Sequence, residues 1–312
     1  MSRGFGSPTA TKRVFEMKNT RDQRSRKAAR ESRRPAGRKA ARTAKKNRPT
    51  ATGQQSRGDA VHWYENDAFW ETMAPAMFSE QRLAAAAEEV DQIRQLGSLS
   101  PGAAILDLCC GPGRHSIELA GRGFRVTGVD RTAAYLERAR AGAKKKRLSV
   151  EFVQDDMRHF CRPGEFDAAI SMYTSFGYFS DPAENKRVIA NLYRSLKPGG
   201  VLIIDMMGKE ILARIFRDRD WVEVDDVILL EERTVGKNWE SLETRWILLK
   251  GNERKEFKFS LWLCSARELS ELLSECGFRT VSFYGDLEGA PYDQKAKRLV
   301  AVARKSKDEM LD

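Results

Sequence analysis

Apolar residues in the middle of the chain follow helical spacing in some stretches and form short strand-like runs in others. From Ser79 to Leu96 they fall three or four positions apart, and Gly97 with Pro101 ends the pattern, which predicts an amphipathic helix. The next predicted strands are residues 103–108, 125–129, 150–153, 166–171 and 201–205, and the predicted helices between them are 113–121, 133–141 and 182–196. Strands that alternate with helices in this way predict a parallel sheet covered on both faces.

After Met206 the pattern changes to strand-like runs with turn residues between them. Runs at 227–230, 242–249 and 257–263 are separated by glycine-containing turns, which predicts an antiparallel meander. A helix at 266–276 and strands near 279–284 and 298–302 close the chain. We therefore expect a tail over 1–58, a lid and helix over 59–100, and a main domain over 101–312 that carries a β insertion at about 207–263.

The charge of the chain is divided unevenly. The 312 residues hold 55 Lys and Arg against 44 Asp and Glu, a net charge of +11. Residues 1–58 carry 18 of the basic residues and three acids, whereas residues 59–312 have a net charge of −4. The segment 1–58 has very few large apolar side chains, so we expect it to be disordered. It is either a solvated tail, a start assigned upstream of the true one at Met17, a transit peptide, or a salt-dependent tether to RNA, DNA or another polyanion.

Apolar run lengths and cysteine spacing exclude several protein classes. The longest purely apolar runs are the five-residue segments 83–87 and 299–303, far short of the roughly 18–20 residues that a membrane span needs. The five cysteines form no C-x-x-C pair, and no apolar signal-peptide core is present at the start. We therefore expect neither a disulfide framework nor a metal site, no membrane association, and a cytoplasmic location.

A glycine turn follows the first predicted strand. Asp107 lies on that strand, Gly111 and Gly113 form the turn, and the following helix offers unpaired N–H groups to a ligand. Asp107 and Ser116, which occupies the third glycine position, depart from the dinucleotide fingerprint. A carboxylate at this place would repel a pyrophosphate and would suit a ligand that carries an ammonium group.

Acidic residues also lie at the ends of the next two predicted strands. Asp130 follows Gly111 by 19 residues, where an acid can accept hydrogen bonds from both hydroxyls of a ribose. Asp156 lies at the third strand end, where it could accept from an adenine amino group while Met157 covers the ring. Because ligands bind at the carboxyl edge of such sheets, three acids at successive strand ends predict a nucleoside-containing ligand there.

The sequence resembles the class I S-adenosylmethionine-dependent methyltransferases over roughly residues 60–304. The motifs that carry the resemblance are 107–115, 126–130, 156–158, 166–178 and 196–200. The resemblance implies an α/β fold, namely a Rossmann-like, doubly wound sheet of seven strands with an antiparallel last strand. It also implies S-adenosyl-L-methionine as the cofactor, with the glycine loop at the methionine moiety, Asp130 at the ribose, and Asp156 with Met157 at the adenine. The expected cofactor contacts are Asp107, Cys110, Gly111, Gly113, Arg114, Asp130, Arg131, Asp156, Met157 and Met172.

Methyl transfer from a sulfonium is an in-line displacement that chiefly requires positioning and exclusion of water, so no metal is needed. Aromatic faces stabilise a sulfonium cation without competing as nucleophiles. The candidates for that wall, or alternatively for ordinary core and lid packing, are Tyr64, Phe69, Trp70, Tyr173, Phe176 and Tyr178. Arg114 either pairs with the carboxylate of the cofactor or caps local acids. His115 is one of three histidines and is not assigned as a base, and Cys109 and Cys110 are expected to pack as small apolar side chains.

The acceptor is expected to be an oxygen, nitrogen or carbon atom of a small molecule. The segment 171–175 lacks the Asn/Asp-Pro-Pro-aromatic turn typical of methylation on base amines, and Cys161 lies in an ordinary loop. The meander is expected to cap the acceptor pocket, with a dimer interface as the alternative, in a monomer or homodimer. The rival hypotheses are methylation of RNA or of a ribosome-associated protein tethered by the tail, a non-catalytic cofactor-binding protein, and a dinucleotide-dependent reductase.

Overall fold

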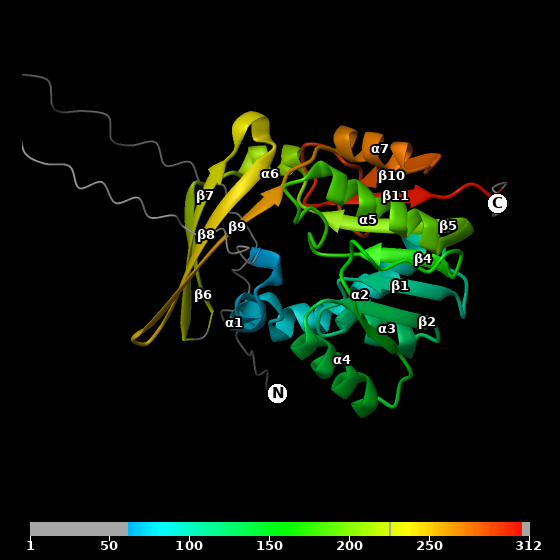
Figure 1. Ribbon diagram of the computed structural model, residues 1–312, viewed down its shortest axis with the longest axis horizontal. Coiled ribbons are helices and arrows are strands. Elements are labelled where there is room, and N and C mark those ends of the chain that lie inside the picture. Colours follow the sequence, from blue (N-terminus) through cyan, green and yellow to red (C-terminus); the bar gives the residue numbers. More distant parts are fainter. Residues whose placement is uncertain (1–61, 225, 308–312) are drawn as a thin grey trace, which may run out of the picture. The chain divides into compact units, whose positions relative to one another are not determined.

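The computed structural model describes residues 62–224 and 226–307 of the chain. The chain divides into two units, residues 1–60 and 61–312, and every described residue belongs to the second unit. The predicted tail over 1–58 therefore lies outside the described residues. Within the described part, an α/β core and a separate small antiparallel sheet make up the structure (Figure 1).

The core is built from seven strands and the helices that connect them. Its strands are β1 (Ala104–Leu108), β2 (Arg125–Asp130), β3 (Glu151–Gln154), β4 (Phe166–Ser171), β5 (Leu196–Met206), β10 (Thr280–Tyr284) and β11 (Leu299–Arg304). The helices are η1 (Trp63–Glu65), α1 (Asp67–Met77), α2 (Glu80–Gly97), α3 (Arg114–Gly121), α4 (Ala133–Lys145), α5 (Pro182–Ser195), α6 (Lys209–Ile215) and α7 (Ala266–Glu275).

The order of the strands fixes where a ligand can bind. It is β10-β11-β5-β4-β1-β2-β3; the pairs among β1 to β5 are parallel, and β11 is antiparallel to both of its neighbours. The direction of winding reverses between β1 and β4, and such a switch point opens a crevice at the carboxyl ends of the strands. The structure thus confirms the predicted seven-stranded fold with its antiparallel last strand.

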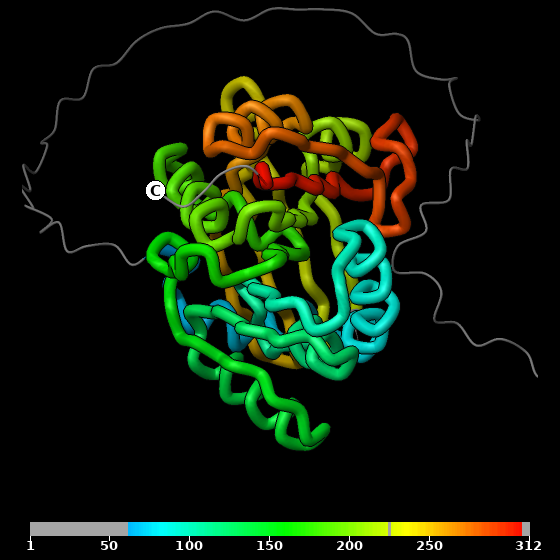
Figure 2. Tube along the Cα trace, turned by 90° about the vertical axis from the view of Figure 1, so that its right-hand side faces the viewer, coloured from blue at the N-terminus to red at the C-terminus, as the bar shows by residue number. Residues whose placement is uncertain are grey.

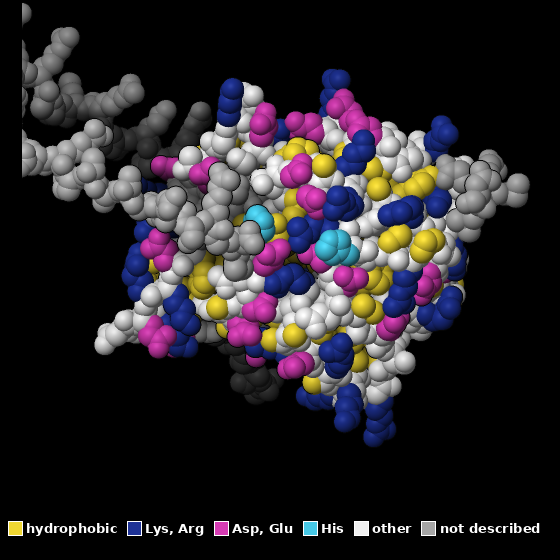
Figure 3. All heavy atoms as spheres, viewed as in Figure 1, with side chains coloured by type: hydrophobic (Ala, Val, Ile, Leu, Met, Phe, Trp, Pro, Cys, Tyr) yellow, Lys and Arg dark blue, Asp and Glu magenta, His cyan; other side chains and the backbone are white. Residues whose placement is uncertain are grey.

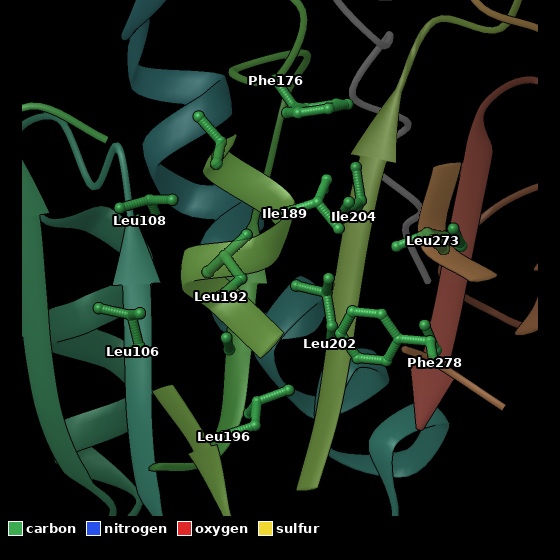
Figure 4. Close-up of a cluster of buried hydrophobic side chains, with 14 of the residues drawn as sticks. Leu106, Leu108, Phe176, Ile189, Leu192, Leu196, Leu202, Ile204, Leu273 and Phe278 are labelled. Atoms are coloured by element: carbon green, nitrogen blue, oxygen red, sulfur yellow. The ribbon is translucent and has the colours of Figure 1, made fainter. Parts of the chain in front are cut away.

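Helices cover both faces of this sheet, as Figure 2 shows for α2 and α5. Val90 and Ile93 of α2 pack on Ile105 and Ile203, whereas α5 and α7 pack on the opposite face. In Figure 4, Ile189 and Leu192 of α5 lie against Leu202 and Ile204 of β5. Because alternate residues of a strand point to opposite faces, β5 supplies apolar side chains to both layers.

The second sheet contains one strand more than the predicted meander. Its strands are β6 (Arg219–Val224), β7 (Val227–Val235), β8 (Ser241–Lys250) and β9 (Glu253–Trp262), in sequence order and all antiparallel, with η2 (Lys237–Trp239) between β7 and β8. The sequence pattern missed β6 because three of its six residues are charged, as is common in an edge strand. It also missed α1, whose aromatic residues mask any helical spacing, and the short helix α6.

The second sheet covers α1. Leu229, Trp246 and Phe257 of this sheet belong to the same apolar cluster as Phe69 and Trp70. Figure 1 shows the arrowheads of β4 and β5 pointing toward α1 and the second sheet. The helix α1 is therefore held between the antiparallel sheet and the carboxyl edge of the parallel sheet.

Candidate functional site

A cavity lies at the carboxyl ends of β1, β2 and β4, beneath η1, α1 and the start of α2. Most of the residues proposed from the sequence line it: Tyr64, Trp70, Asp107, Cys110, Gly111, Arg114, Asp130, Arg131, Asp156, Met157, Met172, Tyr173 and Tyr178. Three do not: Gly113, Phe69 and Phe176. Phe69 and Phe176 are 3% and 2% exposed and pack in apolar clusters.

The second sheet does not line the cavity: within the described residues, none of 219–262 reaches it. The roof of this cavity is instead supplied by η1 and α1, and the antiparallel sheet supports them from behind. The physical reason is the packing of Trp246, Phe257 and Phe259 on Phe69, which leaves α1 between that sheet and the cavity.

The two glycines of the loop after β1 have different roles. Both have positive φ angles, +55° at Gly111 and +77° at Gly113, which a residue with a side chain rarely adopts. A Cβ atom at Gly111 would lie 3.1 Å from Cζ of Phe78, at the cavity. At Gly113 it would lie 2.9 Å from Cβ of Ala139 and 3.1 Å from Cζ of Phe152. Gly111 thus keeps the cavity open, whereas Gly113 allows α3 to pack closely on α4 and β3.

Asp107 is a buried carboxylate at the cavity, with 2% of its surface exposed. Its Oδ2 accepts a hydrogen bond from Oγ of Ser116 at 2.6 Å, and no Lys or Arg forms an ion pair with it among residues 62–224 and 226–307. Burial raises the pKa of Asp107, and the neighbouring His115 and Ser116 oppose that rise. A carboxylate in this state is suited to receive an ammonium group from a ligand.

Asp130 is held by backbone groups on both of its oxygens. Oδ2 accepts from the N–H of Gly111 at 2.8 Å, and Oδ1 accepts from the N–H of Thr132 at 2.9 Å. Burial raises the pKa of this carboxyl, while the two backbone hydrogen bonds lower it. Each oxygen retains a further lone pair, so Asp130 can accept two more hydrogen bonds from a pair of vicinal hydroxyls.

Arg158, which Asp156 holds in place, and Arg131 bind the segment that roofs the cavity. Arg158 donates to Asp156 at 2.9 Å and 2.7 Å and to Glu65 at 3.2 Å. Burial acts to raise the pKa of Asp156, but the hydrogen bonds from Arg158 outweigh it and the pKa is lowered. Arg131 pairs with Asp67 at 2.8 Å. The entry of the chain into α1 is therefore fixed to the ends of β2 and β3.

Glu89 of α2 is a functional candidate that the sequence did not reveal. Its Oε2 accepts from Arg114 at 2.7 Å and from Nε2 of His115 at 2.8 Å, and its Oε1 accepts from the hydroxyl of Tyr173 at 2.5 Å. Burial would raise the pKa of Glu89, but these partners outweigh it and lower the pKa to about 2. Since Glu89 neutralises Arg114, the latter is not a free cation at the cavity.

Arg82, two helical turns before Glu89, is a second candidate that sequence reasoning missed. It lines the cavity and donates to the carbonyl oxygen of Met77 at 3.0 Å, and no carboxylate of the described chain forms an ion pair with it. Burial lowers its pKa, and the charges of Arg114 and Arg298 act in the same direction. The sequence does contain a signal for this pair: Arg82 and Glu89 are seven positions apart on an amphipathic helix, and residues at that spacing lie on the same face.

The loop after β4 is held in an uncommon backbone conformation. Tyr173 and Thr174 have φ angles of +58° and +62°. The N–H of Tyr173 donates to Oδ2 of Asp205 at 3.1 Å, and Arg298 donates to Oδ1 of the same carboxylate at 2.6 Å. The ring of Tyr173 then faces the guanidinium of Arg114 at 4.1 Å. This loop carries Met172, Tyr173 and Ser175 to the cavity wall.

The described residues contain no group of three or more His, Cys, Asp and Glu side chains placed to hold a metal ion. Among these residues, no helix is long and apolar enough to cross a membrane.

A sheet of this order, with a glycine loop after the first strand and acids at the next two strand ends, defines the class I S-adenosylmethionine-dependent methyltransferase fold. Residues 105–200 match the family model described as a methyltransferase domain. The chain is 28% identical over 216 residues to the putative methyltransferase YqeM of Bacillus subtilis, covering 67% of this chain and 87% of that protein. It is 25% identical over 205 residues to a glycine/sarcosine N-methyltransferase of Aphanothece halophytica, covering 64% of this chain and 76% of that protein.

A solved structure gives the same result for the fold. A S-adenosylmethionine-dependent methyltransferase from Clostridium acetobutylicum superposes with a TM-score of 0.64 at 15% identity, over 77% of this chain and 98% of that one. The chain therefore contains a methyltransferase domain with the class I S-adenosylmethionine-dependent methyltransferase fold.

Proposed function

We propose that this protein transfers the methyl group of S-adenosylmethionine to a small-molecule acceptor. The observation that carries the proposal is the set of charges at the cavity that the described protein leaves without an ionic partner. Asp107 and Arg82 are such groups, and Asp130 accepts hydrogen bonds from Gly111 and Thr132 without an ion pair in the described part of the chain. The amino acid end of the cofactor offers an ammonium and a carboxylate, and its ribose offers two hydroxyls.

Each of these groups has a counterpart in the cofactor. Asp107 would receive the ammonium, Arg82 the carboxylate, and Asp130 the ribose hydroxyls, with Met157 beside the adenine. This assignment replaces Arg114 by Arg82 at the carboxylate, because Glu89 already neutralises Arg114 at 2.7 Å. The bound cofactor supplies an activated methyl group. The protein has to hold that group and the acceptor in line and to keep water out.

A cavity with an aromatic roof favours a small acceptor. Tyr64, Trp70 and Phe78 cover it from η1, α1 and the residue after α1, so a long polymer would have to displace the roof. Figure 3 shows Lys and Arg side chains interspersed with Asp and Glu on the face it presents, without one continuous basic stripe. The glycine/sarcosine N-methyltransferase relative also acts on small molecules by its name.

A thermal-shift comparison tests the cofactor assignment. A ligand at about 100 times its dissociation constant stabilises a protein by about 2.7 kcal/mol, so S-adenosylmethionine and S-adenosylhomocysteine should raise the Tm of the full chain, and NAD should not. Asp130→Ala should abolish the shift. Stabilisation by NAD alone would contradict the proposal.

The acceptor class is tested by incubating the protein with methyl-labelled S-adenosylmethionine and a fractionated cell extract. We expect label in the small-molecule fraction, and that label should be absent when Asp130→Ala replaces the wild type. Label that enters only RNA or protein would overturn the small-molecule assignment and favour a tethered, macromolecular substrate.

A further inference from the structure

Resting on the proposed function, we infer that the methyl acceptor is an amine nitrogen and that Trp70, Tyr135 and Tyr178 form an aromatic cage for the methylated ammonium product. These three side chains all line the cavity. They come from α1, α4 and the loop after β4, which tertiary packing brings together.

The three rings lie close to one another. The ring centroids of Trp70 and Tyr178 are 5.9 Å apart, and those of Trp70 and Tyr135 are 6.5 Å apart. Cations held by such groups of rings interact with the negative faces of the π systems, most strongly where water is excluded. Trp70 therefore packs on both tyrosines, and the three rings form one aromatic wall of the cavity.

The polar groups of two of these side chains already donate hydrogen bonds to the protein backbone. Nε1 of Trp70 donates to the carbonyl oxygen of Tyr64 at 2.9 Å, and the hydroxyl of Tyr135 donates to the carbonyl oxygen of Trp70 at 2.5 Å. Their N–H and O–H donors are thus directed at the backbone. What Trp70 and Tyr135 offer to a ligand is ring surface, which recognises a cation or an apolar group better than a hydroxyl or a carboxylate.

The carboxylate of Asp130 acts on both tyrosines of the cage. Burial raises the pKa of Tyr135, and the charge of Asp130 raises it further. Burial likewise raises the pKa of Tyr178, with Cys109 and Asp130 acting in the same direction. Both phenols are therefore neutral at ordinary pH and cannot take a proton from a hydroxyl acceptor.

Two further titratable groups at the cavity, His115 and Asp156, are bound by their own partners, and Asp130 is assigned to the ribose of the cofactor. Nε2 of His115 is bound to Glu89, and Asp156 is paired with Arg158. No hydrogen bond or ring contact within the described part of the chain joins His115 or Asp156 to the three cage rings. A hydroxyl acceptor would need a base at the cage, whereas the lone pair of a neutral amine needs none.

The charge balance of the reaction favours the same acceptor. The amine lone pair forms the N–C bond, the C–S bond breaks with its electron pair left on sulfur, and the positive charge passes from sulfur to nitrogen. The total charge of cofactor and acceptor stays at one throughout, so aromatic walls beside the carboxylate of Asp130 stabilise both ends of the reaction. Transfer to an alkoxide would instead cancel the positive charge of the sulfonium against the negative charge of the oxygen. Surroundings that stabilise a cation would therefore disfavour that reaction.

Binding of a product mimic tests the inference directly. The full chain, saturated with S-adenosylhomocysteine, is titrated by calorimetry with choline and with its uncharged isostere 3,3-dimethylbutan-1-ol. We expect choline to bind about tenfold or more tightly, as a desolvated cation–π site requires. Tyr178→Phe keeps the ring and should preserve this ratio, and Tyr178→Leu removes the ring and should reduce it toward one.

The outcomes separate this inference from the proposed function. Equal affinity of the two isosteres, tighter binding of the alcohol, or binding of neither would overturn the amine acceptor. Failure of S-adenosylhomocysteine itself to bind would instead contradict the methyltransferase proposal. If Tyr178→Leu does not fold, Trp70→Leu provides the same comparison from α1.

Discussion

The hydroxyl of Tyr173 donates a hydrogen bond to Glu89 at 2.5 Å, which joins the loop after β4 to α2. The same carboxylate holds Arg114 and His115, the first two residues of α3. One side chain thus fixes the end of the glycine loop and one wall of the cavity. Because its own side chain is only 12% exposed, replacement of Glu89 should affect both regions at once.

Glu89→Ala should destabilise the protein by about 3–5 kcal/mol, because it leaves Arg114 as a buried and unpaired cation. Urea unfolding monitored by circular dichroism gives this change. Glu88→Ala is the matched control, since Glu88 is the exposed neighbour on the same helix and its loss should change stability by less than about 0.5 kcal/mol. Similar effects of the two variants would contradict the role of Glu89.

The pKa of Glu89, lowered to about 2 from the usual 4.5, predicts an acid dependence. A carboxyl with a depressed pKa in the folded state contributes stability that is present above the unfolded value and is lost as pH falls through the folded value. Wild type should therefore lose this contribution between about pH 4.5 and 2, and Glu89→Gln should show a smaller loss over that range. Parallel curves of unfolding free energy against pH would show that Glu89 is not the group responsible.

Arg82→Met should weaken the binding of S-adenosylmethionine and S-adenosylhomocysteine by about tenfold to a hundredfold, the range for loss of a hydrogen bond to a charged group. The affinity for 5′-methylthioadenosine, which lacks the amino acid carboxylate, should stay within about twofold of wild type. Calorimetry measures all three ligands. Arg94→Met, an exposed arginine on the same helix, is the control and should leave every affinity unchanged.

Substitutions of Asp107 and Asp130 should weaken the binding of different sets of ligands. Asp107→Asn should reduce affinity for the two ligands that carry an ammonium group by about tenfold and spare 5′-methylthioadenosine. Asp130→Asn should weaken all three ligands, because each of them contains the ribose. An equal loss for 5′-methylthioadenosine in both variants would mean that Asp107 acts through the fold of the glycine loop.

Asp205→Ala should destabilise the fold by about 3–5 kcal/mol, since Asp205 is 3% exposed and its loss leaves the guanidinium of Arg298 without a carboxylate partner. The double variant Asp205→Ala with Arg298→Met should recover part of that loss, because it removes the unpaired cation. Chemical denaturation of the wild type, Asp205→Ala, Arg298→Met and the double variant supplies the cycle. Strict additivity of the two single changes would show that the pair does not interact.

The local pattern of apolar residues was sufficient to predict most strands and helices of the α/β core. Alternating apolar runs predicted β1 to β5 and the helices between them within a few residues, since a strand buried on both faces leaves a distinct signal. The acids at 107, 130 and 156 could be placed at one edge of the sheet because the carboxyl ends of parallel strands share that edge. The short edge strand β6 and helices α1 and α6 gave no such signal.

Tertiary structure alone decided which charges at the cavity have partners. The sequence identifies Arg114 beside the glycine loop, but only the packing of α2 on α3 brings Glu89 to it and leaves Arg82 facing the cavity. Likewise, Phe69 and Trp70 are near neighbours in sequence, yet the antiparallel sheet buries the first and the second lines the cavity. The sequence by itself determined the sheet, the glycine loop and the acids of the cofactor site, because these depend on local period and strand order. The ion pairs and ring contacts that complete the site join residues far apart in the chain, and for that reason they were decided by the packing of whole elements.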